Sequence, residues 1–247
     1  MPQIVAIIPA RLAATRLPNK PLVDIVGKTM IEHVWRRAKR VSSLTEVVIA
    51  TPDTEIKAVV EAFGGIAIMT DAAHRSGTDR VAEAARTMGL EPDAIVVNIQ
   101  GDEPLLEAEG IEAVIALLKA DSQLPMASLS CPCPEFDREN PACVKVVTAQ
   151  NGDALYFSRN RIPFPRNPDT GVPVMQHVGL YAYRNAFLQT YATLSPTPLE
   201  QTEGLEQLRV LENGYRIRLA RVEKAPIGVD TEEDLLRARE ALRDFQY

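Results

Sequence analysis

Three cationic side chains stand close together near the N-terminus. Arg11, Arg16 and Lys20 lie within ten residues of one another, directly after an apolar run that we expect to be a strand. Cations at the carboxyl end of a strand in an open α/β sheet are placed where such folds bind ligands, and a triphosphate is the obvious anion for them. The segment has no glycine-rich fingerprint, so it is neither a P-loop nor a Rossmann dinucleotide site. On spacing alone, a solvated basic loop is the competing interpretation.

Two aspartates follow apolar stretches much further along the chain. Asp102 comes after the apolar run 94–99, in the sequence NIQGDEP, and Asp230 lies in GVDTEEDL. Mg²⁺ binds hard oxygen ligands, usually one or two carboxylates together with waters and substrate phosphates, so the two aspartates are candidates for one magnesium site. The alternative interpretation of Asp102 is a turn residue, and that of Asp230 is the residue just ahead of a helix N-cap at Thr231.

The cysteines do not indicate a reactive site. Cys131 and Cys133 are separated by one proline and Cys143 stands alone, a spacing that fits none of the usual zinc motifs. We expect all three to be small buried apolar side chains in a reducing compartment. The sequence also offers no recognisable serine or cysteine nucleophile with a partnered base, which agrees with a direct transfer that forms no covalent enzyme intermediate.

Alternating strands and helices must position these residues. In the first half, short apolar runs at 4–8, 47–50, 66–69 and 94–99 alternate with amphipathic segments around 30–38, 56–63, 81–88 and 111–118. This rhythm is typical of βαβ units, and solidly apolar strands indicate a parallel sheet that is covered on both faces. Gly64 and Gly89 fall where two of these helices need a left-handed residue at the C-terminus.

The pattern changes after about residue 125. The apolar runs 144–147 and 154–157 flank an Asn151-Gly152 turn and predict a hairpin, while four prolines between 162 and 174 predict a long loop, often a lid or a dimer contact. Further on we expect a strand near 178–183, a helix over 205–211 closed by Gly214, a strand over 215–219 and a final helix capped by Thr231.

These elements predict one α/β domain over residues 1–247, with a Rossmann-like mixed sheet. Residues 1–130 and 200–247 would form the nucleotide-binding core. Residues of about 131–199 would form an antiparallel excursion.

Composition excludes several classes of protein. The 247 residues carry 27 Lys and Arg against 33 Asp and Glu, a net charge of −6 without a long basic stripe, which argues against nucleic acid as a partner. Apolar runs are far shorter than the roughly 18 residues needed to cross a bilayer, and the first one is too short for a signal-peptide core. We expect a cytoplasmic protein that does not bind membranes.

Seven segments of the chain form a recognisable set. They are IIPAR with Arg16 and Lys20, HRSGTDR at 74–80, NIQGDEP at 98–104, ALYFSRNRIP at 154–163, HVGLYAY at 177–183, LEQLR at 205–209 and GVDTEEDL at 228–235. Taken together, these motifs resemble those of the 3-deoxy-manno-octulosonate (KDO) cytidylyltransferases. They occur in the family's order over essentially the whole chain. The resemblance implies a fold of the nucleotide-diphospho-sugar transferase type, a homodimer through the excursion, and Mg²⁺-dependent transfer of CMP from CTP to KDO for lipopolysaccharide biosynthesis.

The resemblance also assigns roles to individual residues. Its catalytic set would be Arg11 and Lys20, which neutralise charge on the leaving pyrophosphate, and the magnesium ligands Asp102 and Asp230. The CTP contacts that it implies are Ala10, Arg11, Lys20, Ser76, Gly77 and Asp102. The sugar-acid contacts that it implies are Arg16, Gln100, His177, Tyr181, Glu206 and Gln207. Because Glu206 and Gln207 would be neighbours on one helix, we expect only one of them to point into the pocket.

Some residues have a simpler interpretation. The segment from Ser76 to Thr78 also reads as an ordinary loop and N-cap before a helix. His33 and Trp35 take no role from the family and are expected to be packing and surface residues, and a substrate contact of Arg75 is left open.

Three other functions remain as alternatives. The acceptor sugar acid could instead be sialic acid or an amino-KDO. A catalytically silent nucleotide-binding paralogue is a second alternative, although it would not need the full set of Arg11, Lys20, Asp102 and Asp230. A nucleotide-sugar glycosyltransferase is the third, but such enzymes usually present an Asp-x-Asp pair, which the stretch from Gly101 to Glu103 lacks.

Overall fold

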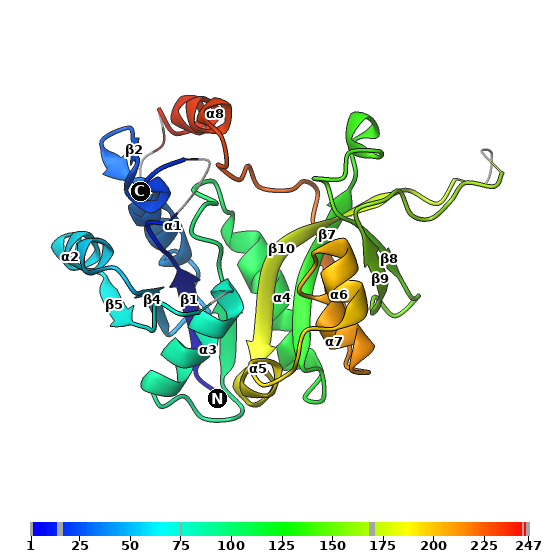
Figure 1. The fold of residues 1–247 in the computed structure, drawn as a ribbon, viewed down its shortest axis with the longest axis horizontal. Coiled ribbons are helices and arrows are strands. Elements are labelled where there is room, and N and C mark those ends of the chain that lie inside the picture. The colour runs from blue at the N-terminus through cyan, green and yellow to red at the C-terminus, as the bar shows by residue number, and fades with distance from the viewer. Residues whose placement is uncertain (1, 14–16, 75, 168–170, 244, 246–247) are drawn as a thin grey trace.

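The computed structural model describes residues 2–13, 17–74, 76–167, 171–243 and 245 (Figure 1). Its main sheet has the strand order β11-β7-β10-β6-β1-β4-β5. These strands are β1 (Ile4–Pro9), β4 (Glu46–Thr51), β5 (Ile66–Met69), β6 (Ile95–Asn98), β7 (Met126–Pro132), β10 (Met175–Arg184) and β11 (Ile217–Arg221). β1 pairs in parallel with β4 and β6, whereas β10 runs antiparallel to β6 and β7. The predicted mixed α/β sheet is confirmed.

Helices cover both faces of this sheet. Ile4, Ala6 and Ile8 of β1 belong to one apolar cluster, and Val5 and Ile7 belong to another, because successive side chains of a strand point to opposite faces. The first cluster includes residues of α1 (Met30–Ala38), α2 (Thr54–Ala62) and α4 (Ala108–Ala120). The second includes residues of α3 (Gly77–Thr87), α5 (Asn185–Tyr191) and α7 (Leu208–Glu212). The continuous apolar runs of the sequence follow from this double cover.

Turns and caps lie where the residue types predicted them. Gly64 and Gly89 have φ angles of 83° and 65° at the ends of α2 and α3. The Thr231 side chain accepts a hydrogen bond from the backbone N–H of Asp234 and so caps α8 (Glu232–Leu242). Glycine is suited to the first two positions because it adopts positive φ without a Cβ clash.

The second half adds antiparallel strands. β8 (Lys145–Thr148) and β9 (Ala154–Ser158) pair as the predicted hairpin, and β8 also pairs with the start of β10. The other half of β10 lies between β6 and β7, so this one strand belongs both to the added hairpin and to the central sheet. The chain on either side of residues 168–170 runs out from the body as a long arm (Figure 1).

Three features differ from the sequence-based expectation. β5 is an edge strand with Ile66 47% exposed, so it is not covered on both faces. The helix predicted over 205–211 begins only at Leu208, and a separate short helix α6 (Pro198–Glu203) precedes it. Short elements without a periodic apolar pattern were also missed: β2 (Asp24–Ile25), β3 (Lys28–Thr29) and the 3₁₀ turns η1 (Lys20–Leu22) and η2 (Glu135–Asp137).

Among the described residues, no helix is long and apolar enough to span a membrane.

Candidate active site

The loop that follows β1 and carries Arg11 and Lys20 is hydrogen-bonded at its start to β4 and to the residue ahead of α2. The backbone N–H of Ala10 donates to the Ala50 carbonyl at 2.9 Å, and that of Leu12 donates to Asp53 Oδ2 at 2.8 Å. Arg11, between them, is exposed at the carboxyl edge of the parallel strands. The carboxyl ends of β1 and β4 therefore hold the start of this loop in place.

Lys20 joins the two predicted metal-ligand aspartates. Its Nζ donates to Asp102 Oδ2 at 2.7 Å and to Asp230 Oδ1 at 2.8 Å. The Lys20 side chain is 15% exposed, and those of the two aspartates are 35% and 49% exposed. Burial by itself would lower the pKa of Lys20, but the charges and hydrogen bonds of the two carboxylates outweigh it and raise that pKa. The lysine is therefore held as an ammonium group between two carboxylates.

Backbone contacts bring Asp230 to Asp102 although the two are far apart in the sequence. The backbone N–H of Val229 donates to the carbonyl of Asp102 at 2.9 Å. Val229 also belongs to a small apolar cluster in which residues of α8 contact Leu17 and Ile25. Docking of the C-terminal helix thus places Asp230 and also supports the loop that carries Lys20.

Two hollows, which share several lining residues, lie at this edge of the sheet. The larger, of about 400 Å³, is lined by Pro9, Ala10, Arg11, Ala13, Leu17, Lys20, Pro21, Gln100, Gly101, Asp102 and Asp230. The smaller, of about 120 Å³, is lined by Pro9, Ala10, Arg11, His74, Ser76, Gly77, Arg80 and Gln100. The structure therefore brings together every residue that the family resemblance placed on CTP.

Gly101 makes a close backbone approach at the boundary of the site. A Cβ built there would lie 2.9 Å from the carbonyl oxygen of Pro9. Any larger residue would push the end of β6 away from the end of β1, and with it the neighbouring Asp102.

His177 and Tyr181, two of the residues predicted to bind the sugar acid, lie on β10. His177 is buried between the rings of Phe157 and Tyr181, and its Nε2 contacts Ser128 Oγ at 2.9 Å. Burial lowers the pKa of His177 to about 3, so the imidazole is neutral at physiological pH. Gln100 connects the two regions because its Nε2 donates to the Gly179 carbonyl of β10 at 3.4 Å.

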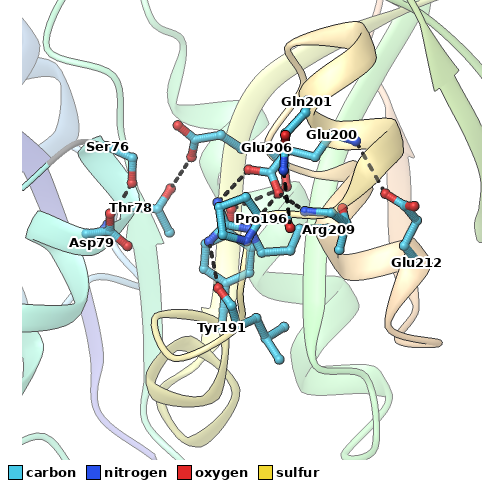
Figure 2. Close-up of polar contacts among 12 residues, drawn as sticks. Ser76, Thr78, Asp79, Tyr191, Pro196, Glu200, Gln201, Glu206, Arg209 and Glu212 are labelled. Carbon is cyan, nitrogen blue, oxygen red and sulfur yellow. Dashed lines mark hydrogen bonds and ion pairs between the residues drawn. The ribbon is translucent and has the colours of Figure 1, made fainter.

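Glu206 and Gln207 do not share a helix, contrary to our expectation. Gln207 is the N-cap of α7, and Glu206 lies in the turn between α6 and α7. The Gln207 side-chain nitrogen lies 3.5 Å from His177 Nδ1, whereas Glu206 accepts a hydrogen bond from Thr78 on α3 (Figure 2). Because a turn does not fix side chains at helical angles, the two neighbours point to different groups.

Sequence reasoning missed two charged residues beside the site. Burial, and secondly the charge of Asp102, raise the pKa of Glu103 to about 8, and Glu103 Oε2 has no hydrogen-bond partner among the described residues. Arg80 is buried and lines the smaller hollow, where it donates to the Thr70 hydroxyl. The sequence gives no clear signal for the first, because the burial that raises the pKa of Glu103 is a property of the fold.

Two predicted or open assignments fall outside the described residues. Arg16, expected at the sugar-acid carboxylate, and Arg75 both lie there. The three cysteines are buried as expected, and the Sγ atoms of Cys133 and Cys143 lie 3.6 Å apart.

The aspartate pair has the chemistry of a magnesium site. One oxygen of each carboxylate already converges on the Lys20 ammonium, so the two side chains point at a single position that a cation can occupy. Across the described chain, no third carboxylate, histidine or cysteine completes a larger cluster. A set of one or two carboxylates that leaves room for phosphates suits Mg²⁺ rather than Zn²⁺.

A mixed α/β sheet with cations and carboxylates at its carboxyl edge is typical of proteins that bind nucleotides at this edge. Residues 5–218 match the family model described as cytidylyltransferase, and this chain is accordingly an enzyme of the nucleotidyltransferase class.

Proteins of similar sequence and structure identify the family within the nucleotidyltransferases. A 3-deoxy-manno-octulosonate cytidylyltransferase of Syntrophobacter fumaroxidans is 51% identical over 94% of both chains, and one of Syntrophotalea carbinolica is 46% identical over 97% of this chain and 98% of its own. A solved CMP:2-keto-3-deoxy-manno-octonic acid synthetase in complex with CTP is 44% identical, covers 98% of both chains and superposes with a TM-score of 0.93. The chain belongs to the 3-deoxy-manno-octulosonate cytidylyltransferase family.

Proposed function

We propose that this enzyme transfers CMP from CTP to the anomeric hydroxyl of KDO and releases pyrophosphate. The observation that carries the proposal is the Lys20 ammonium bound to both Asp102 and Asp230 beside a hollow that Arg11 also lines. This arrangement offers two cations for a triphosphate and two carboxylates for a metal at one point. The names of the relatives described above support CTP and KDO as the two substrates.

Positioning and charge neutralisation do most of the work in such a transfer. The smaller hollow next to Ala10, Ser76 and Gly77 takes the nucleoside, which directs the phosphates toward Arg11 and Lys20. These two cations neutralise the charge that builds on the leaving pyrophosphate. Because attack on the α-phosphate is in line, the sugar acid has to enter on the side opposite the pyrophosphate.

The sugar acid is bound by the residues along β10 and the turn before α7. Gln100 reaches both regions, and His177 serves as a neutral hydrogen-bonding group because its burial keeps it unprotonated. Glu206 and Gln207 bind hydroxyls of the sugar, and Arg16 is proposed to bind its carboxylate.

Mg²⁺ is the proposed cofactor, with Asp102 and Asp230 as its protein ligands. Bound there, the ion would polarise and neutralise the phosphate oxygens of CTP. The Lys20 ammonium contacts one oxygen of each of these two carboxylates. If the carboxylates bound the metal through these oxygens, the lysine would turn toward the phosphates.

The cellular setting is also proposed. KDO is a sugar acid of lipopolysaccharide, so we assign the reaction to lipopolysaccharide biosynthesis, in the cytoplasm where CTP is made. We further propose a homodimer through the excursion of residues 131–199, which exposes large apolar side chains such as Phe136 and Phe164.

Pyrophosphate release tests the reaction. Purified protein is assayed with Mg²⁺, each of the four nucleoside triphosphates in turn, and KDO or sialic acid as acceptor. We expect release with CTP and KDO only. Release with sialic acid instead would transfer the same chemistry to another sugar acid, and CTP binding without release for either acceptor would support the silent-paralogue alternative.

A further inference from the structure

A hydrogen bond links the proposed nucleotide side of the enzyme to the proposed sugar-acid side. Thr78 is the second residue of α3, two positions after Ser76, the N-cap that lines the smaller hollow. Its Oγ1 donates to Glu206 Oε2 at 3.2 Å, and the two residues are 128 positions apart in the sequence (Figure 2). Nothing in the family resemblance assigned a role to Thr78.

The direction of the Thr78 hydrogen bond follows from the chemistry of its two ends. A carboxylate oxygen accepts and a threonine hydroxyl carries a single proton, so Thr78 Oγ1 donates to Glu206 Oε2. Thr78 is itself only 5% exposed, so its hydroxyl proton has little competition from water.

The backbone of Glu206 is held separately from its carboxylate. The Tyr191 hydroxyl of α5 donates to the Glu206 carbonyl at 3.2 Å, and the Arg209 guanidinium lies 4.8 Å above the Tyr191 ring. Arg209 in turn makes a two-pronged ion pair with Glu200 of α6 (Figure 2). These contacts set the path of the turn, and within that turn Thr78 selects where the carboxylate points.

Glu206 remains able to meet a ligand. The residue is exposed, unlike its neighbours Leu205 and Gln207, which are buried. The hydrogen bond to Thr78 uses Oε2, and a carboxylate can accept several hydrogen bonds, so Oε1 stays available to a sugar hydroxyl.

We propose that Thr78 is a positioning residue for the sugar acid: it orients the Glu206 carboxylate from the helix whose N-terminus lines the nucleotide hollow. The inference rests on the proposed function, because it takes Glu206 as a contact of KDO. It also gives a physical link between the two subsites, since a shift at the start of α3 is passed to Glu206 through one hydrogen bond.

Steady-state kinetics with CTP and KDO test this role. Thr78→Val keeps the volume of the side chain and removes its hydroxyl, so the KM for KDO should rise about three- to tenfold, as expected for the loss of one typical hydrogen bond. The KM for CTP and kcat should stay within about twofold. Thr78→Ser restores the hydroxyl and should restore the KM for KDO. Thr87→Val, at the exposed last residue of the same helix, is the matched control.

A double-mutant cycle separates positioning from a general structural effect. Glu206→Ala should itself raise the KM for KDO, and adding Thr78→Val to it should raise the KM no further, because Thr78 acts through Glu206.

Four results would overturn the inference. An equal effect of Thr78→Val with and without Glu206 would show that the threonine acts independently of it. An equal rise in both KM values would place its effect on the helix as a whole. If Glu206→Ala raised the KM for KDO and Thr78→Val did not, the sugar-acid site would stand and only the role of Thr78 would be wrong. An unchanged KM in Glu206→Ala would instead remove Glu206 from the proposed pocket.

Discussion

At the scale of single residues, opposite charges converge from three distant segments on one point. Lys20, Asp102 and Asp230 were recognisable in the sequence because charged side chains follow apolar strands or precede a helix cap, where α/β folds bind ligands. The contact between Thr78 and Glu206 was not recognisable, because no periodicity relates residues 128 positions apart. Residue types thus predict which chemistry is present, and only the fold decides which groups meet.

The aspartate pair gives the first residue-scale prediction. Asp102→Asn should abolish Mn²⁺ binding, measured by electron paramagnetic resonance, and lower Mg²⁺-dependent turnover by at least about 100-fold. The fold should survive because the Asp102 side chain is 35% exposed and fills no core volume. Asp93→Asn, at an exposed position away from the site, is the control. Full activity in Asp102→Asn would remove this residue from the metal site.

Burial of His177 gives a second prediction, on stability. The folded protein lowers the pKa of His177 to about 3 from an ordinary value of 6.5, so the unfolded chain binds more protons between these values. The contribution of neutral His177 to the free energy of unfolding is fully present above pH 6.5. It is lost as the pH falls, and the loss is about 2 kcal/mol at pH 5. Between pH 7.5 and pH 5, the unfolding free energy of His177→Gln should therefore fall less than that of the wild type. Parallel curves for the two proteins would contradict it.

At the scale of elements, hydrophobic periodicity predicted the long pieces and failed for the short ones. The helices α1 to α4 and the strands β1, β4 and β6 carry apolar faces that repeat several times, which is a strong signal. α6 has six residues and no such repeat. The sequence feature that indicates α6 is the capping box of Thr197 and Glu200. In place of a repeating apolar face, polar contacts such as that between Glu200 and Arg209 hold this helix.

The ion pair between α6 and α7 gives the element-scale prediction. The side chains of Glu200 and Arg209 are 10% and 11% exposed, so Arg209→Met would leave a carboxylate largely buried without its partner. We expect a loss of about 3 kcal/mol in the free energy of unfolding, measured with urea. Glu200→Gln combined with Arg209→Met should recover part of this loss. Arg237→Met removes the partner of Asp234 at a side chain that is 58% exposed, and should cost less than about 0.5 kcal/mol.

At the scale of the whole molecule, the order of the strands could not be read from the sequence. Local patterns predicted a strand near 178–183, but they do not say that β10 inserts between β6 and β7. That placement depends on long-range pairing, and the resulting fold brings the turn of Glu206 into contact with Thr78 of α3. The assembly of the site therefore depends on the order of the strands in the sheet, whereas the residue types that form it can be recognised in the sequence.

Surface exposure in the second half gives the last prediction, the proposed homodimer. Phe136, Phe164, Val172 and Leu155 are 85%, 84%, 71% and 62% exposed, and all four lie within residues 131–199. Large apolar groups exposed in one region are characteristic of a protein interface. Light scattering after size-exclusion chromatography should therefore give twice the chain mass of 27.2 kDa. Phe164→Ser should shift the equilibrium toward monomer. Leu236→Ser, which changes a residue of α8 that is 57% exposed, should not. A wild-type protein that remains monomeric at micromolar concentration would rule out the dimer, and the exposed arm would then need a different partner.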